Sequence, residues 1–155
     1  MNPKRHRINF EKKLIDKDAL KVLKVLHKAK FEAYLVGGCI RDLLLGKIPK
    51  DFDIATNATP EQVHKLFKRS RLIGRRFPIV HIMFSARKYI EVATFRAPHN
   101  HINKGGVVRD NHYGTLKEDV LRRDFTVNAL YYDTNKFQVI DFVDGLSAIN
   151  ECKIC

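Results

Sequence analysis

The chain of 155 residues contains only three cysteines, which is too few and an odd number for a disulfide-rich secreted domain. We therefore expect reduced thiols and a cytoplasmic location. No apolar run approaches the ~20 residues of a membrane span, and the basic N-terminus lacks the apolar centre of a secretory signal. No internal repeat and no low-complexity segment is present. These absences predict one ordinary domain that has no membrane partner.

Acidic residues are scarce as well. The 17 Asp and Glu stand against 29 Lys and Arg, which gives a formal net charge of +12. Such an excess favours a polyanionic partner through counterion release and electrostatic steering. Charge alone does not distinguish that partner from a generally basic surface.

The sequence also lacks a complete zinc pattern and a Ser-His-Asp or Cys-His catalytic set. Cys152 and Cys155 form half of a zinc motif without its other half, so we interpret them as free thiols. His99, His101 and His112 lie in a polar segment without cysteines at zinc spacing, which favours RNA contact or plain solvation. Chemistry must therefore be sought among the carboxylates.

Two features of the stretch from residue 35 to 54 suggest metal and phosphate chemistry. Gly37 and Gly38 follow an apolar run and open a helical pattern, where bare backbone N–H groups suit phosphate. Asp51 and Asp53 stand one residue apart in a predicted strand, so both side chains would project from the same face. Paired carboxylates of this kind suit Mg²⁺. The alternative is a turn-forming Asp and a surface Asp on either side of a buried Phe52.

A third carboxylate, Glu91, lies within the apolar segment 89–95. A carboxylate at such a position is costly to bury without a cation. We interpret Glu91 as a third metal ligand from a neighbouring strand, with a paired structural glutamate as the alternative.

The hydrophobic periodicity predicts helices and strands in mixed order. Thr59, Pro60 and Gln62 form a capping-box start for one helix, and Gly46 ends another. The polar segment 97–114 is expected to be a long loop. Predicted helices cover residues 18–29, 39–45, 60–69 and 116–130, and predicted strands cover 31–36, 51–55, 78–84, 89–95 and 137–141. The pattern indicates an α+β fold with a mixed or antiparallel sheet flanked by helices.

Four motifs, in order and with matched spacing, resemble the head domain of bacterial poly(A) polymerases and class II tRNA nucleotidyltransferases, in the DNA polymerase β-like superfamily. They are LVGGCIRDLLLG at 35–46, KDFDIATNATPEQV at 50–63, IEVATFR at 90–96 and RRDFTVNALYYD at 122–133, and the similarity extends through VIDFVDG at 139–145. The resemblance implies template-independent transfer of AMP from ATP to the 3′ end of RNA.

The resemblance also implies roles for individual residues. Asp51 and Asp53 would hold two catalytic Mg²⁺ ions. Asp124 would be a further active-site carboxylate, and either it or Glu91 would complete the metal set. The remaining positions implied to contact the nucleotide are Gly37, Gly38, Arg41 and Arg123.

We expect three parts in the chain: a basic N-terminal arm at 1–17 that is disordered or contacts RNA, the catalytic head at 18–150, and a short end at 151–155 without the neck and body domains of the full enzymes. Arg75 and Arg76, after the turn at Gly74, favour the polyadenylating branch. A CCA-adding head and a non-catalytic RNA- or nucleotide-binding fragment are the alternatives. The motifs give no oligomeric state.

Overall fold

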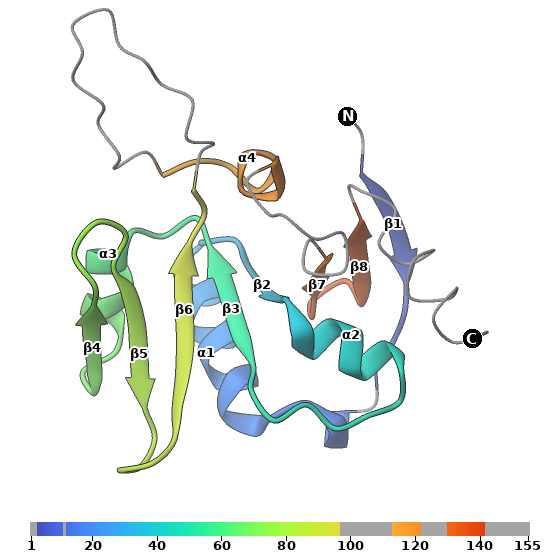
Figure 1. Ribbon diagram of the computed structural model, residues 1–155, viewed down its shortest axis with the longest axis horizontal. Helices are drawn as coiled ribbons and strands as arrows, with labels where there is room; N and C mark the ends of the chain where they lie inside the picture. The colour runs from blue at the N-terminus through green and yellow to red at the C-terminus, as the bar shows by residue number, and fades with distance from the viewer. Residues whose placement is uncertain (1–2, 11, 97–112, 122–129, 142–155) are drawn as a thin grey trace, which may run out of the picture.

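A computed structural model of the chain describes residues 3–10, 12–96, 113–121 and 130–141 (Figure 1). These residues form one mixed sheet with helices around it, as the sequence predicts. The strands are β1 (Lys4–Arg7), β2 (Ala33–Val36), β3 (Asp53–Thr56), β4 (Ser70–Ile73), β5 (Ile79–Met83), β6 (Tyr89–Thr94), β7 (Leu130–Asp133) and β8 (Gln138–Asp141). The helices are α1 (Lys17–Lys28), α2 (Gly38–Leu44), α3 (Pro60–Leu66) and α4 (Leu116–Leu121), with a 3₁₀ turn at Lys12–Leu14.

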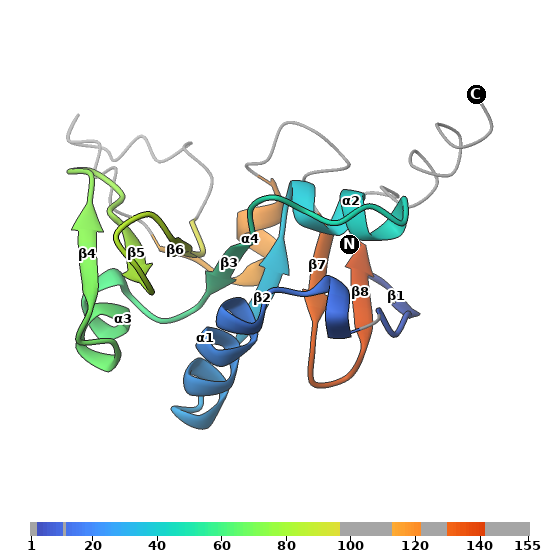
Figure 2. The ribbon, with the colours of Figure 1, turned by 90° about the horizontal axis from the view of Figure 1, so that it is seen from below.

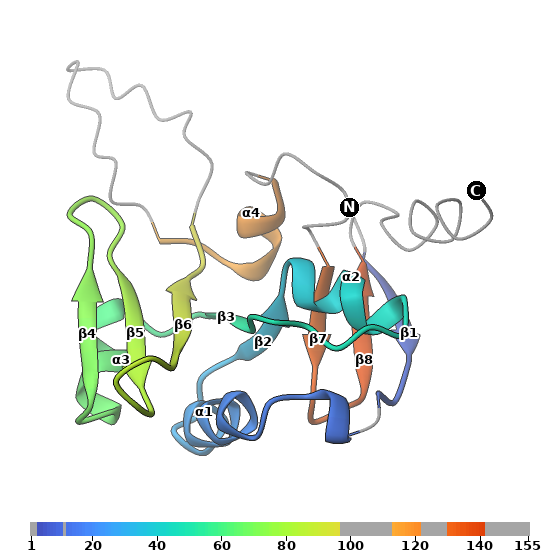
Figure 3. The ribbon, with the colours of Figure 1, turned by 60° about the horizontal axis from the view of Figure 1, so that its bottom comes forward.

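The sheet has the strand order β1-β8-β7-β2-β3-β6-β5-β4. Neighbouring strands run antiparallel except for β3 and β6, which are parallel. Helices α1 and α3 lie on one side of the sheet, and α4 lies on the other (Figures 2 and 3). In Figure 1, α1 and α3 are behind the sheet, and no described helix lies in front of β4, β5 and β6.

Helix α1 forms because its apolar residues recur on one face. Ala19, Val22, Leu23 and Leu26 are buried, and lysines occupy the exposed positions between them. Asp16 is the N-cap and accepts hydrogen bonds from the backbone N–H groups of Asp18 and Ala19. The helix therefore begins one residue earlier than the periodicity predicts.

The two predicted helix boundaries with a specific capping mechanism are confirmed. At the start of α3, Thr59 Oγ1 accepts from Gln62 N–H, and Gln62 Oε1 accepts from Thr59 N–H. At the end of α2, Gly46 has φ +75°, and its N–H donates to Leu43 O while Lys47 N–H donates to Asp42 O. This pair of bonds is a Schellman motif, which glycine favours at that position.

Two apolar clusters fill the two sides of the sheet. The larger one joins α1, α3 and α2 to alternate strand residues that include Leu35, Ile54 and Val92. The smaller one joins α4 to the opposite faces of β2 and β7, through residues that include Val36 and Tyr131. The alternation along each strand thus decides which side chains are in the larger core and which project from the other side.

Several sequence predictions are corrected by the structure. The helix predicted over residues 116–130 does not reach Leu130, because Leu130 begins β7 between β2 and β8 and is fully buried. The helix predicted to end at Arg69 ends at Leu66, and Ser70–Ile73 form β4 instead. The described part of the expected N-terminal arm belongs to the fold: Lys4–Arg7 pair with β8, and Phe10 and Ile15 are buried.

No helix among the described residues is both long enough and apolar enough to cross a membrane.

Candidate active site

The sheet register brings Asp53, Glu91 and the start of the glycine turn together. In the antiparallel pair of β2 and β3, Val36 is opposite Asp53, so the glycine turn that follows Val36 begins beside Asp53. In the parallel pair of β3 and β6, Asp53 is opposite Glu91. Side chains of directly paired residues lie on the same face of a sheet, so Asp53 and Glu91 are neighbours.

Asp51 lies at the same site as Asp53 and Glu91, but not for the reason that the sequence predicts. Strand β3 begins at Asp53, so Asp51 precedes the strand and the two-residue alternation does not determine its direction. Asp51 is nevertheless exposed at a pocket of about 490 Å³ that Asp53 and Glu91 also line. The pocket is lined by Asp16, Asp51, Asp53 and Glu91, by Lys50, Arg87 and Lys88, and by Phe52, Tyr89 and Ile90.

The glycine turn lies at the start of α2. Gly37 has φ +80° and ψ −146°, a conformation that is essentially restricted to glycine. The Arg41 side chain lies near Gly38 in the first turn of α2, since a Cβ built at Gly38 would be 3.7 Å from Arg41 Nη2. The Arg41 side chain is about half exposed, at 48%, and its Nε lies 3.6 Å from Asp42 Oδ1. The bare backbone that follows Val36 thus begins beside Asp53, and the Arg41 cation lies near Gly38.

Cys39, in the first turn of α2, has a structural role. Its Sγ donates a hydrogen bond to Val36 O at 3.2 Å, and the residue is only 4% exposed. Burial raises the pKa of the Cys39 thiol to about 12, and the negative charge of Asp53 acts in the same direction. The thiol is therefore neutral at physiological pH, which excludes it as a nucleophile there.

The donor set of the pocket fits Mg²⁺. Asp51 and Asp53 supply hard carboxylate oxygens, and Mg²⁺ takes one or two protein carboxylates while water and phosphate oxygens complete its shell. Within the described part of the chain, no three His, Cys, Asp or Glu side chains are grouped closely enough to hold one ion together. Glu91 as a third ligand accordingly stays a prediction.

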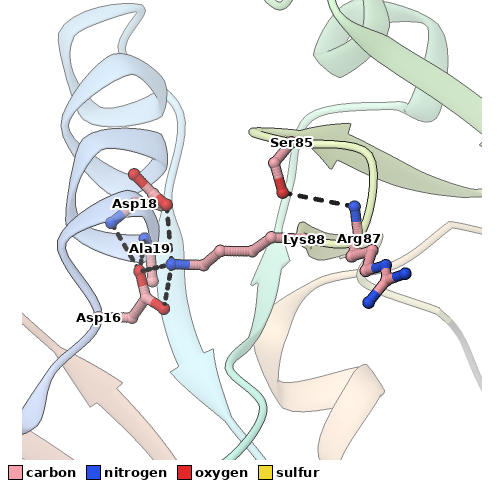
Figure 4. A network of polar contacts seen from close by, with 6 residues as sticks. All are labelled: Asp16, Asp18, Ala19, Ser85, Arg87 and Lys88. Carbon is pink, nitrogen blue, oxygen red and sulfur yellow. Dashed lines mark hydrogen bonds and ion pairs between the residues drawn. The ribbon is translucent and has the colours of Figure 1, made fainter.

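The hairpin between β5 and β6 brings cations to the pocket. Lys88 extends from this hairpin to the start of α1, where its Nζ lies 2.7 Å from Asp16 Oδ2 and 2.8 Å from Asp18 Oδ2 (Figure 4). Arg87 points away from that network in the same view.

The network shifts the ionisation of its members. Burial disfavours the charged form of Asp16, but hydrogen bonds from Lys88 and from the backbone of Asp18 and Ala19 outweigh it and lower the pKa of Asp16. The hydrogen bonds to Asp16 and Asp18 raise the pKa of Lys88. Both shifts favour the charged pair, so the network ties the hairpin to α1 across the pocket.

Sequence reasoning missed several residues in or beside the pocket. Tyr89 lines it, and His81 lies next to it, with Nε2 at 3.4 Å from Glu91 Oε1. The two-residue alternation along β6 could have placed Tyr89 on the face of Glu91, and an Asp before a helical pattern could have identified Asp16 as an N-cap. His81 gave no local signal, because only the pairing of β5 with β6 puts it opposite Glu91.

Some predicted residues lie outside the described residues. Arg123 and Asp124 belong to the segment 122–129, so their proximity to the pocket is untested. The same holds for His99, His101 and His112 and for Cys152 and Cys155.

Comparison with known proteins gives a consistent result over most of the chain. A family profile described as the poly A polymerase head domain matches residues 33–155. Poly(A) polymerase I of Salmonella typhimurium is 51% identical over 152 residues, which cover 92% of this chain and 32% of that protein. A CCA-adding enzyme of Bacillus pumilus is 38% identical over 136 residues, which cover 88% of this chain and 34% of that protein.

The fold is also similar to that of solved structures. The crystal structure of the Bacillus stearothermophilus CCA-adding enzyme in complex with CTP superposes with a TM-score of 0.70 at 36% identity, over 86% of this chain and 31% of that one. The expected nucleotidyltransferase head fold is thereby confirmed. The chain spans about a third of the length of the curated relatives that it matches.

Proposed function

Because the chain belongs to the family of the poly A polymerase head domain, we propose that it is the catalytic head of a nucleotidyltransferase that adds AMP from ATP to RNA 3′ ends. The observation that carries this proposal is the convergence of Asp51, Asp53 and Glu91 on one pocket beside the glycine turn at Gly37. The head would comprise residues 18–150 together with Lys4–Arg7, which pair with β8. We also propose that the protein acts in the cytoplasm.

Asp51 and Asp53 are the residues proposed to hold Mg²⁺, with Glu91 or Asp124 completing the set. When bound, two such ions would activate the attacking 3′-OH and stabilise the leaving pyrophosphate. The chain's own contribution is to fix Asp53 and Glu91 on paired strands, with Asp51 two residues before β3, so that little reorganisation is needed during the reaction.

The groups around the glycine turn are proposed to hold the triphosphate of ATP. At Gly37 nothing lies within 4 Å of the position that a Cβ would take, so phosphate oxygens can approach the backbone N–H groups of this turn, which continues into Gly38. Arg41 Nη2 lies near Gly38, and the guanidinium can donate in a bidentate manner to phosphate. Arg123 would make a further contact with the nucleotide.

Polyadenylation is favoured over CCA addition by the comparisons. Identity is 51% to a poly(A) polymerase and 38% to a CCA-adding enzyme over similar lengths. The turn with the exposed Arg75 and Arg76, which suggested the same branch, lies between β4 and β5. CCA addition is the second candidate, because the fold superposes on a CCA-adding enzyme.

The direct test is to incubate the chain with Mg²⁺, labelled ATP or CTP, and either an unstructured RNA primer or a tRNA that lacks its CCA end. Homopolymeric A tails on the unstructured primer would support the proposal. Addition of C, C and A followed by a stop on the tRNA would replace it with the second candidate. The absence of transfer under all conditions would leave a binding fragment.

We predict that Asp51→Asn and Asp53→Asn abolish metal-dependent transfer and weaken Mn²⁺ binding while the fold is retained. Two carboxylates that share a metal site repel each other without the cation, so removing one charge should not destabilise the metal-free chain. Circular dichroism melts and Mn²⁺ titration by electron paramagnetic resonance measure the two effects. Glu61→Gln, an exposed carboxylate on α3 away from the pocket, is the matched control. Wild-type Mn²⁺ affinity in both variants would refute the metal role.

A further inference from the structure

A row of polar side chains continues from the carboxylates across two more strands. Glu91 is opposite His81 on β5, and His81 is opposite Arg71 on β4. Because directly paired side chains share a face, Glu91, His81 and Arg71 project on the same side of the sheet as Asp53. Ile90 and Val92 project to the other side, into the core with α1 and α3.

The side of the sheet that bears Asp53 and Glu91 also carries an exposed aromatic ring beside the pocket. Tyr89 lies two residues before Glu91 on β6 and is therefore on the same face. Its ring stacks on the His81 ring, with centroids 4.0 Å apart and planes at 14°, while 49% of the residue stays exposed. The contact between His81 Nε2 and Glu91 Oε1 fixes the stacked pair relative to the pocket. The ring is thus held at a set position next to the carboxylates.

Exposed cations lie on the elements that neighbour the stacked rings. Arg71 is exposed on edge strand β4. Arg69 is exposed just before that strand, where its O accepts a hydrogen bond from Met83 N–H of β5. Arg87 is exposed in the hairpin that precedes Tyr89. None of these three arginines forms an ion pair with another described residue, so their charge is available to an external anion.

We propose that this surface, formed by Tyr89, His81, Arg69 and Arg71, binds the 3′-terminal nucleotides of single-stranded RNA, with one base stacked on Tyr89. Single strands combine a π-face and a phosphate in every nucleotide, and stacking on an aromatic ring together with a cationic border recognises that combination without regard to sequence. A duplex would keep its bases stacked inside and would not use the ring. The inference rests on the proposed function, because it supplies the position from which the 3′ end would enter the carboxylate pocket.

The test is the fluorescence anisotropy of a labelled oligoadenylate with the chain and Mg²⁺, in the absence of any nucleotide. Tyr89→Ala should weaken RNA binding about tenfold, since base–aromatic stacking contributes that order of affinity. Tyr89→Trp keeps an aromatic plane and should stay within about threefold of the wild type. Calorimetry with ATP and Mg²⁺ is the parallel measurement. A larger loss of affinity for RNA than for ATP in Tyr89→Ala assigns the ring to an RNA base, and the reverse assigns it to the base of the incoming nucleotide.

The contribution of the Arg71 charge to RNA binding can be compared with a matched control on the opposite side of the sheet. Arg71→Gln and Lys24→Gln each remove one positive charge, but Lys24 is exposed on α1. Arg71→Gln should weaken RNA binding and reduce the salt dependence by about one counterion, whereas Lys24→Gln should change neither appreciably. Circular dichroism confirms that each variant is folded.

Three results would overturn the inference. The first is no measurable RNA binding by the wild type, and the second is unchanged RNA binding in Tyr89→Ala, whether or not ATP binding is weakened. The third is an equal loss of RNA binding in Arg71→Gln and Lys24→Gln. The assay contains no nucleotide, so it is independent of the transfer reaction. If RNA binding depends on Tyr89 but no transfer occurs, the proposed RNA-binding surface is supported and the proposed function is refuted. If transfer occurs and RNA binding does not depend on Tyr89, the proposed function is supported and the proposed RNA-binding surface is refuted.

Discussion

At the scale of single residues, Gly37 determines how the chain leaves β2 and enters α2. Its φ of +80° with ψ of −146° lies in a region that residues with a Cβ rarely adopt, although nothing lies within 4 Å of the position that a Cβ would take. The constraint on this residue is therefore the backbone conformation and not the space around it. Gly38 differs, because it lies in the first turn of the helix without a positive φ.

This difference gives a paired prediction. Gly37→Ala should lower the free energy of unfolding by about 1–3 kcal/mol, because alanine is strained in that conformation. Gly38→Ala should be neutral or slightly stabilising, since alanine favours a helix and its Cβ would make an ordinary 3.7 Å contact with Arg41. Urea unfolding measures both. Equal stability of the two variants would contradict the assignment of strain to Gly37.

At the scale of elements, the β5–β6 hairpin is joined to α1 by a few charged side chains. Lys88 of the hairpin pairs with Asp16 and Asp18 at the helix start (Figure 4). Asp16 also caps the helix, so a single carboxylate serves both the helix and the contact between elements. The hairpin carries Arg87 and leads directly into Tyr89 and Glu91, so this contact helps to position one wall of the pocket.

The contribution of Asp16 should depend on pH. Asp16→Asn keeps a good N-cap but removes the charge, so it should cost at most about 1 kcal/mol at neutral pH, as for a partly exposed ion pair. The pKa of Asp16 is lowered from 3.8, so its stabilisation is present above pH 3.8 and is lost as the pH falls through the lowered value. The pKa of Lys88 is raised from 10.5, so the alkaline loss begins above pH 10.5.

Urea unfolding of the wild type and Asp16→Asn between acidic and alkaline pH tests this prediction. The difference in stability should be level across the neutral range and should shrink at both extremes. A difference that persists at acidic pH would mean that Asp16 acts through capping alone.

At the scale of the whole molecule, the two sides of the sheet differ in what covers them. Helices α1 and α3 cover one side and complete the larger core. The other side leaves β4, β5 and β6 without a described helix, and there the carboxylates and the Tyr89–His81 pair lie. On this second side Asp53 and Glu91 line the carboxylate pocket, in a chain whose formal net charge is +12.

RNA binding by the whole chain should accordingly depend on salt. If about three arginines replace counterions on a single strand, affinity should fall roughly 10- to 20-fold between about 50 and 200 mM salt. Anisotropy titrations at several salt concentrations measure the slope, and thermal melts at the same concentrations check that the chain stays folded. A level affinity would remove the electrostatic contribution from the proposed RNA contact.

The sequence by itself determined the local features of this protein. Its apolar periodicity predicted most helices and strands, and the caps at Thr59 and Gly46 were predicted because capping depends on neighbours only a few residues away. The motifs around Gly37, Asp51 and Asp53 indicated the family. The tertiary structure alone decided the pairing of β3 with β6, which sets Glu91 beside Asp53, and of β5 with β6, which sets His81 beside Glu91. It also decided that Leu130 belongs to a strand and that Lys4–Arg7 complete the sheet edge. Strand register joins segments that are distant in the chain, and no local periodicity encodes which distant partner a strand will meet.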